Sequence, residues 1–63
     1  MPKYQVIDYN GSSYYDVAPG IFFTLSRVIR ENKVKSIVGD LNKIVVSCDT
    51  TTIIIIKAYD GVD

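Results

Sequence analysis

The sequence is poor in the side chains that most enzyme and metal sites need. It has no histidine, no tryptophan, one cysteine and one methionine among 63 residues. Without histidine, neither a Ser-His-Asp nor a Cys-His arrangement can be built, and no ordinary general base titrates near neutral pH. One thiol without imidazole cannot assemble the usual zinc ligand sets. We therefore expect no enzyme activity, no metal and no cofactor.

Cys48, the single cysteine, excludes an internal disulfide. It ends an apolar run without an evident cationic neighbour, so its thiolate should be scarce and a role in the core is expected. A free thiol suits a reducing compartment, and Met1-Pro2-Lys3-Tyr4 does not begin a signal peptide. The longest apolar run, Ile53 to Ile56, is too short to span a membrane. We expect a cytoplasmic protein.

The sequence also lacks net charge, because seven basic and seven acidic residues cancel. No overall field attracts the chain to nucleic acid or to an anionic membrane. One basic group does lie late in the predicted helix and just after it, comprising Arg27, Arg30, Lys33 and Lys35. It is either a weak nucleic-acid contact or a solvated helix end that complements the helix dipole, and the neutral net charge favours the second interpretation.

A chain of 63 residues has room for one domain, 1–63, and for one core. Such a core rarely supplies more than about 3–5 kcal/mol, and small natural domains often add a disulfide, a metal or a partner. The first two supports are excluded by composition. Association with a second copy or with another protein is the remaining candidate.

The clearest local signal is a β-hairpin over residues 4–17, centred on Asn10-Gly11. This dipeptide is favoured in two-residue type I′ turns. The turn would place Asp8 and Asp16 on different faces, which argues against a shared metal or sugar site. One predicted face contains Tyr4, Val6, Asp8, Ser13, Tyr15 and Val17, and the other contains Gln5, Ile7, Tyr9, Ser12, Tyr14 and Asp16. The first is the better core face.

An amphipathic helix is predicted from Ile21 to about Asn32, after the interruption at Ala18-Pro19-Gly20. Its apolar stripe consists of Ile21, Phe22, Leu25, Val28 and Ile29. Three β-branched runs follow, at 34–38, 43–48 and 52–58, and predict a meander. The chain is thus expected to be a small α+β domain of order ββαβββ, an antiparallel sheet with one helix packed on one face.

The last strand is apolar at successive positions, so both of its faces need cover, although one helix can shield only one face. A three-residue loop at 49–51 would pair Cys48 with Thr52 and leave Ile53 and Ile55 exposed. A two-residue loop would shift this set. We prefer the three-residue loop.

Two functions follow from these features. The first is a non-catalytic protein-binding module, similar in size and style to phage-encoded inhibitors such as anti-CRISPR proteins, that occludes the surface of a larger protein. Its expected contacts are Ile7, Tyr9, Tyr14, Ile53 and Ile55. The second is a homodimeric structural scaffold in which the isoleucine-rich strand or its open face pairs with its twofold mate and so supplies the missing second layer. Its element order, an internal helix between a hairpin and a meander, resembles a roadblock-type domain without its terminal helices. A weak nucleic-acid binder ranks third.

Overall fold

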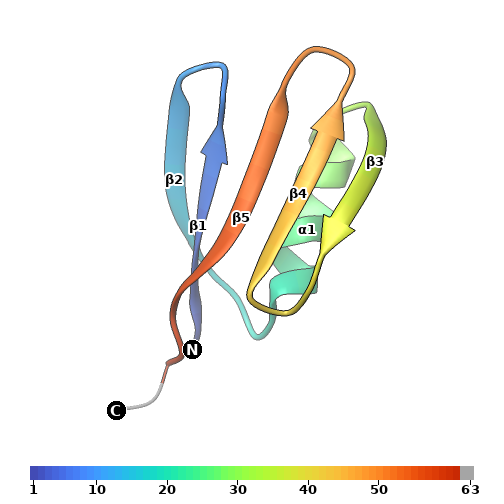
Figure 1. Ribbon diagram of the computed structural model, residues 1–63. Helices are drawn as coiled ribbons and strands as arrows, with labels where there is room; N and C mark the ends of the chain where they lie inside the picture. Colours follow the sequence, from blue (N-terminus) through green and yellow to red (C-terminus); the bar gives the residue numbers. More distant parts are fainter. Residues whose placement is uncertain (62–63) are drawn as a thin grey trace.

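The computed structural model of the chain, which describes residues 1–61, is a single antiparallel sheet with one helix on one side (Figure 1). The element order is ββαβββ, which confirms the predicted α+β class. The strands are β1 (Lys3–Asp8), β2 (Ser12–Val17), β3 (Val34–Gly39), β4 (Lys43–Cys48) and β5 (Thr52–Tyr59), and the helix is α1 (Ile21–Glu31). Their order across the sheet is β2-β1-β5-β4-β3.

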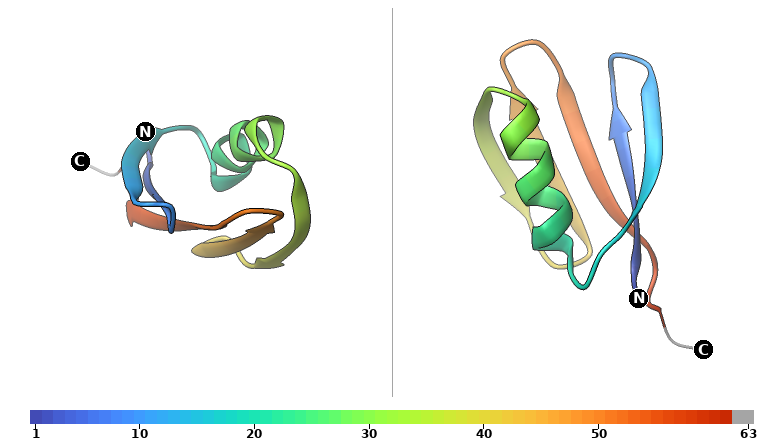
Figure 2. Two further views of the ribbon diagram at one scale, coloured as in Figure 1. Left: turned by 90° about the horizontal axis from the view of Figure 1, so that it is seen from above. Right: turned by 180° about the vertical axis from the view of Figure 1, so that it is seen from behind.

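The helix connects the two edges of this sheet. It leaves β2 at one edge, crosses behind the sheet and leads into β3 at the other edge (Figures 1 and 2). It lies over the half of the sheet formed by β5, β4 and β3, and no further element within residues 1–61 covers the opposite face of the sheet. The sheet therefore has a helix side, which holds the core, and an open face.

The core combines alternate residues of the three central strands with one stripe of the helix. Its fully enclosed members include Val6, Val46 and Ile55, each at most 2% exposed, together with Val28 of α1. Other buried apolar residues are Tyr4, Ala18, Ile21, Leu25, Ile44, Cys48 and Ile53. Leu25 lies in the helix stripe as predicted.

The first hairpin forms where predicted, but its turn is of another kind. Gly11 N–H donates to Asp8 C=O at 2.9 Å, and Asp8 pairs with Ser12, so Tyr9, Asn10 and Gly11 all belong to the loop. Among residues 1–61, only glycines have positive φ, and Gly11 has φ 109°. A type I′ turn needs positive φ at both central residues. The loop instead combines a tight turn with a glycine bulge. The Asp8 side chain stabilises this turn by accepting a hydrogen bond from the Asn10 N–H at 2.9 Å.

This longer loop moves β2 by one residue, and every β2 side chain changes face. Tyr4 now opposes Asp16, and Gln5 opposes Tyr15. The predicted hairpin faces are therefore wrong for β2: Tyr14 and Asp16 lie on the helix side, whereas Tyr15 and Val17 lie on the open face. The expectation that Asp8 and Asp16 point to different faces is wrong for the same reason.

The register of the last two strands also differs from the preferred prediction. Ser47 pairs with Thr52, and Val46 pairs with Ile53. Cys48 N–H donates to Thr51 C=O at 2.9 Å, so the turn follows the two-residue alternative. The start of β5 is tied to the end of β1, because Thr51 Oγ1 donates to Asp8 Oδ1 at 2.6 Å and Tyr9 N–H donates to Thr52 C=O at 3.1 Å.

Ile53 and Ile55 consequently belong to the core, with exposed fractions of 3% and 0%. The prediction that these two residues are the exposed pair is wrong, and Ile54 and Ile56 take the open face instead. Strand β5 also lies at the centre of the sheet, between β1 and β4. It has no free edge through which a second copy could pair.

The helix is rotated toward β2 relative to the predicted stripe. Ile21, Leu25 and Val28 are buried as expected, but Phe22 is 60% exposed and Ile29 is 42% exposed. Thr24 is buried in their place, because its Oγ1 donates to Asp16 Oδ2 at 2.6 Å. Within residues 1–61, no side chain caps the helix N-terminus, and Arg30 lies in the last turn of the helix.

Candidate functional site

The open face is apolar across four neighbouring strands. Ile7 pairs with Ile54, Ile54 with Val45, and Val45 with Val38, so these side chains form one row across the sheet. We call this set the apolar row. An antiparallel sheet with one solvated face normally alternates apolar and polar residues, with the polar ones facing water. Here the side without the helix is apolar as well.

Larger side chains extend the apolar row along neighbouring strands. Ile56 lies on the same face of β5 as Ile54, and it pairs with Gln5, which in turn pairs with Tyr15. Tyr15 is 61% exposed, and Val38 at the far end of the row is 68% exposed. Ile7, Val45, Ile54 and Ile56 are half-buried by their neighbours. The outer ends of this surface are therefore more accessible than its centre.

The charges on the open face have one sign. Lys3 and Lys43 are its charged strand residues among those described, and no acidic strand residue of residues 1–61 projects from it. Lys3 Nζ lies 5.8 Å from the centroid of the Tyr15 ring, within the range of a cation–π contact. Lys43 pairs with Ile56, which pairs with Gln5, so Lys43 lies on the same side of the apolar row as Lys3. The surface is thus an apolar row with two basic residues toward the end of the sheet where β1 and β4 begin.

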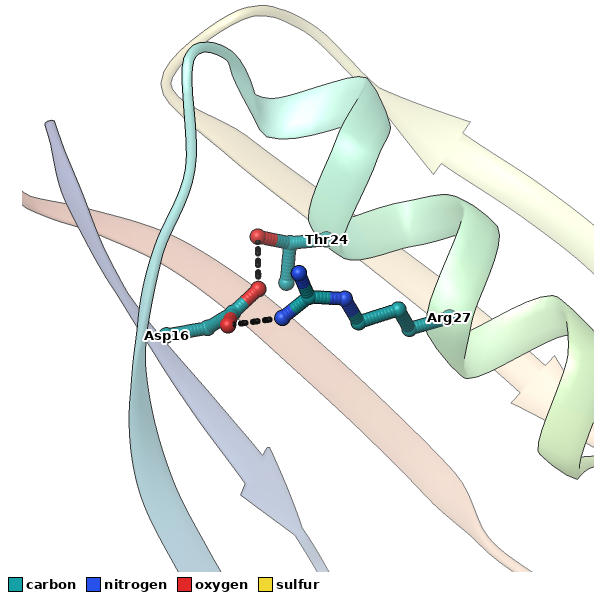
Figure 3. A network of polar contacts seen from close by, with 3 residues as sticks. All are labelled: Asp16, Thr24 and Arg27. Atoms are coloured by element: carbon teal, nitrogen blue, oxygen red, sulfur yellow. Dashed lines mark hydrogen bonds and ion pairs between the residues drawn. The ribbon is translucent and has the colours of Figure 1, made fainter. Parts of the chain in front are cut away.

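On the helix side, one polar cluster joins β2 to α1 (Figure 3). The carboxylate of Asp16, itself buried, accepts hydrogen bonds from the Thr24 hydroxyl and from the Arg27 guanidinium. Each carboxylate oxygen has its own donor, so the charge is satisfied although it lies beneath the helix. This cluster fixes the rotation of the helix and was not predicted. Its only signal in the sequence is a threonine and an arginine one turn apart, facing a strand that carries an aspartate.

Beside this cluster is an open groove of about 430 Å³ lined by Tyr14, Arg27, Arg30 and Glu31. Burial raises the pKa of the Tyr14 phenol, and the Glu31 and Asp16 carboxylates raise this pKa further. The guanidinium of Arg27 is held by Asp16, and Arg30 and Glu31 bring opposite charges to the same groove. The lining therefore selects neither an anionic nor a cationic ligand.

The predicted contact residues are only partly brought together. Ile7 lies in the apolar row, whereas Tyr9 is exposed in the hairpin loop and Tyr14 lines the groove on the helix side. Ile53 and Ile55 are buried. Tyr15, Val38, Val45, Ile54 and Ile56 were missed. The one-residue error in each of two registers accounts for Tyr15, Ile54 and Ile56.

The basic group is dispersed and partly neutralised. Arg27 is engaged by Asp16, whereas Lys33 lies in the connection from α1 to β3, where its backbone C=O accepts the Asp49 N–H at 3.0 Å. Arg30, Lys33 and Lys35 are exposed, at the end of α1 and the start of β3.

Cys48 and Asp8 have opposite pKa shifts. Burial raises the pKa of the Cys48 thiol, and the Asp8 and Asp49 carboxylates add to this effect, so the thiol is a poor nucleophile. The hydrogen bond from Thr51 lowers the pKa of Asp8, and the one from Asn10 acts in the same direction.

No three potential metal ligands lie together within residues 1–61. In this part of the chain, no helix is long and apolar enough to cross a membrane.

No family model, curated protein sequence or solved structure matches the chain.

Proposed function

We propose that the protein is a non-catalytic binding module that docks another protein on the open face of its sheet. The observation that carries the proposal is the apolar row Ile7, Ile54, Val45 and Val38, which crosses four strands on the side without the helix. Exposed apolar surface of this kind is typical of protein contacts when polar residues border it. Occluding a functional surface of the bound protein would make the module an inhibitor.

The charges favour a particular kind of partner. Because Lys3 and Lys43 border the apolar row and no acidic strand residue described on this face balances them, a complementary surface would be apolar with carboxylates at its rim. The open face supplies no carboxylate of its own from the described strands, so the proposed partner is a different protein with an acidic rim.

Affinity capture from host extract, with three versions of the tagged chain, tests this proposal. The parent chain and a Phe23→Ser control should retain the same binding partner, because Phe23 is exposed on the helix and away from the open face. The double variant Ile54→Thr, Val38→Ser replaces two apolar side chains of the open face by small polar ones that β5 and β3 can accommodate. This variant should lose the partner. Circular dichroism of all three chains checks that each is folded.

Two further results separate the alternatives. Binding that persists in the double variant at the parent's level would contradict docking on the open face. Capture that disappears after nuclease treatment and depends on Arg30 and Lys35 would support the nucleic-acid alternative instead. With a protein partner in hand, replacing Lys43 with Ser should slow association and reduce its dependence on salt.

A further inference from the structure

Strand β3 (Val34–Gly39) is an edge strand with unpaired backbone groups. In the part of the chain that the structure describes, it is last in the sheet order and pairs only with β4. Asp40 N–H donates to Lys43 C=O at 2.9 Å, and hydrogen-bonded positions alternate along an antiparallel ladder. The backbone N–H and C=O of Ile37 and Gly39 therefore point away from β4, toward the free edge.

Little in the sequence of β3 protects this edge. Natural edge strands are commonly blocked by proline, by several charges or by a covering segment. The strand contains no proline, and its single charged residue is Lys35, next to the register shift between Val34 and Ser36. The stretch from Ser36 to Gly39 is regular and uncharged.

Exposed apolar side chains lie on both sides of the β3 edge. Val38 projects on the open face, and Ile37, 44% exposed, projects on the helix side. Phe22 and Ile29 are seven positions apart and share one side of α1. Arg27, on the other side of the helix, reaches Asp16 of β2. By helical spacing, Phe22 and Ile29 therefore face away from β2, toward the β3 side.

The charges at the two ends of β3 are self-complementary. Lys33 and Lys35 lie at its start, and Asp40 follows its end. In an antiparallel pair of identical strands, the start of each strand lies beside the end of the other, so the lysines of one copy approach Asp40 of its mate. The β2 edge has no such property, because its only charged residue is Asp16.

We infer that a second copy of the chain pairs antiparallel along β3, with the twofold axis near Ile37, and joins two five-stranded sheets into one. Because the chain has no net charge, no overall electrostatic repulsion opposes this association. A twofold axis perpendicular to the sheet places both open faces on the same side, so the dimer presents the apolar row twice. The inference stands on the β3 edge and does not depend on the proposed function.

Sedimentation equilibrium over a range of concentrations tests this dimer. The parent chain should approach twice the monomer mass, and Ile37→Lys should weaken association about tenfold or more, because like charges would meet at the twofold axis. The matched control is Val17→Lys on the opposite edge, where an exposed valine is replaced in the same way. This control should self-associate like the parent.

If Ile37→Lys perturbs the fold, the milder variant Asp40→Asn tests the same interface. Asp40→Asn retains the side-chain oxygen that accepts the Asn42 and Lys43 N–H groups, but it removes the charge. It should weaken the dimer roughly two- to tenfold, as expected for exposed ion pairs that occur twice. A parent chain that stays monomeric at all concentrations would overturn the inference. A dimer that dissociates in Val17→Lys rather than in Ile37→Lys would overturn it as well.

Discussion

Replacing Ile55 with Ala is expected to remove most of the stability of this fold. Ile55 is fully buried in the central strand, between Val6 of β1 and Ile44 of β4. Truncating a buried isoleucine costs about 2–5 kcal/mol, because apolar burial is lost and a cavity remains. A single core of this size supplies about 3–5 kcal/mol in all. Urea denaturation followed by circular dichroism should therefore show a variant that is largely unfolded or close to it.

The matched control is Ile54→Ala, the same change one residue earlier on the open face. Ile54 is half-buried, so its truncation should cost well under half as much. If Ile55→Ala is too unstable to measure, Ile55→Val and Ile54→Val make the same comparison, with about 0.5–1.5 kcal/mol expected at the buried position. Equal losses at the two positions, or a larger loss at Ile54, would mean that the register of β5 is wrong.

Replacing Gly39 with Ala should be nearly as harmful, for a backbone reason. Gly39 has φ +150°, and a Cβ there would lie 2.2 Å from the Lys43 carbonyl oxygen and 2.7 Å from Ile44 Cα. Neither obstacle is a flexible side chain, so the turn between β3 and β4 must open. The backbone strain and the overpacking together should lower the free energy of unfolding of Gly39→Ala by roughly 2–5 kcal/mol.

Gly20 provides the control for this substitution. It has an extended backbone, with φ −164°, and a Cβ there would meet nothing within 4 Å. Gly20→Ala should therefore change the free energy of unfolding by less than about 1 kcal/mol, the scale of ordinary helix-capping differences. Thermal melts of the two variants side by side measure the contrast. A Gly39→Ala melt that overlays the parent would show that the β3–β4 turn is not built as described.

The elements themselves could be predicted from the sequence because each has a strong local signal. The helix stripe at Ile21, Leu25 and Val28 and the β-branched runs of the last three strands depend only on side-chain periodicity. The last strand has isoleucines on both of its faces, and one helix can cover only one face. The sequence therefore also predicted an apolar open face, and this prediction does not depend on the strand register.

Registers could not be predicted, because each accompanies a side-chain hydrogen bond that the turn dipeptides do not reveal. Asn10-Gly11 favours a two-residue turn, but the Asp8 side chain binds the Asn10 N–H and lengthens the loop to three residues. At the other hairpin, Thr51 donates to the same Asp8, 43 positions earlier in the sequence. Each hydrogen bond moves a strand by one residue, and a shift of one residue exchanges the two faces.

The rotation of the helix has a similar origin. Hydrophobicity alone favours burying Phe22 and Ile29, yet the hydrogen bond from Thr24 to the buried Asp16 turns both toward solvent. An unpaired carboxylate beneath the helix would be costly, so the polar cluster outweighs the gain from burying larger side chains. Two exposed apolar residues on the β3 side are the result.

The central claim is that the helix-free face presents Ile54 and Ile56 to solvent while Ile53 and Ile55 lie in the core. The most direct test is the broadening of isoleucine methyl signals in NMR spectra by a soluble nitroxide. We expect Ile7, Ile54 and Ile56 to broaden at nitroxide concentrations that leave Ile53, Ile55 and Ile44 sharp. Broadening of Ile53 and Ile55 instead, or equal protection of both sets, would contradict the open apolar face and the binding function proposed for it.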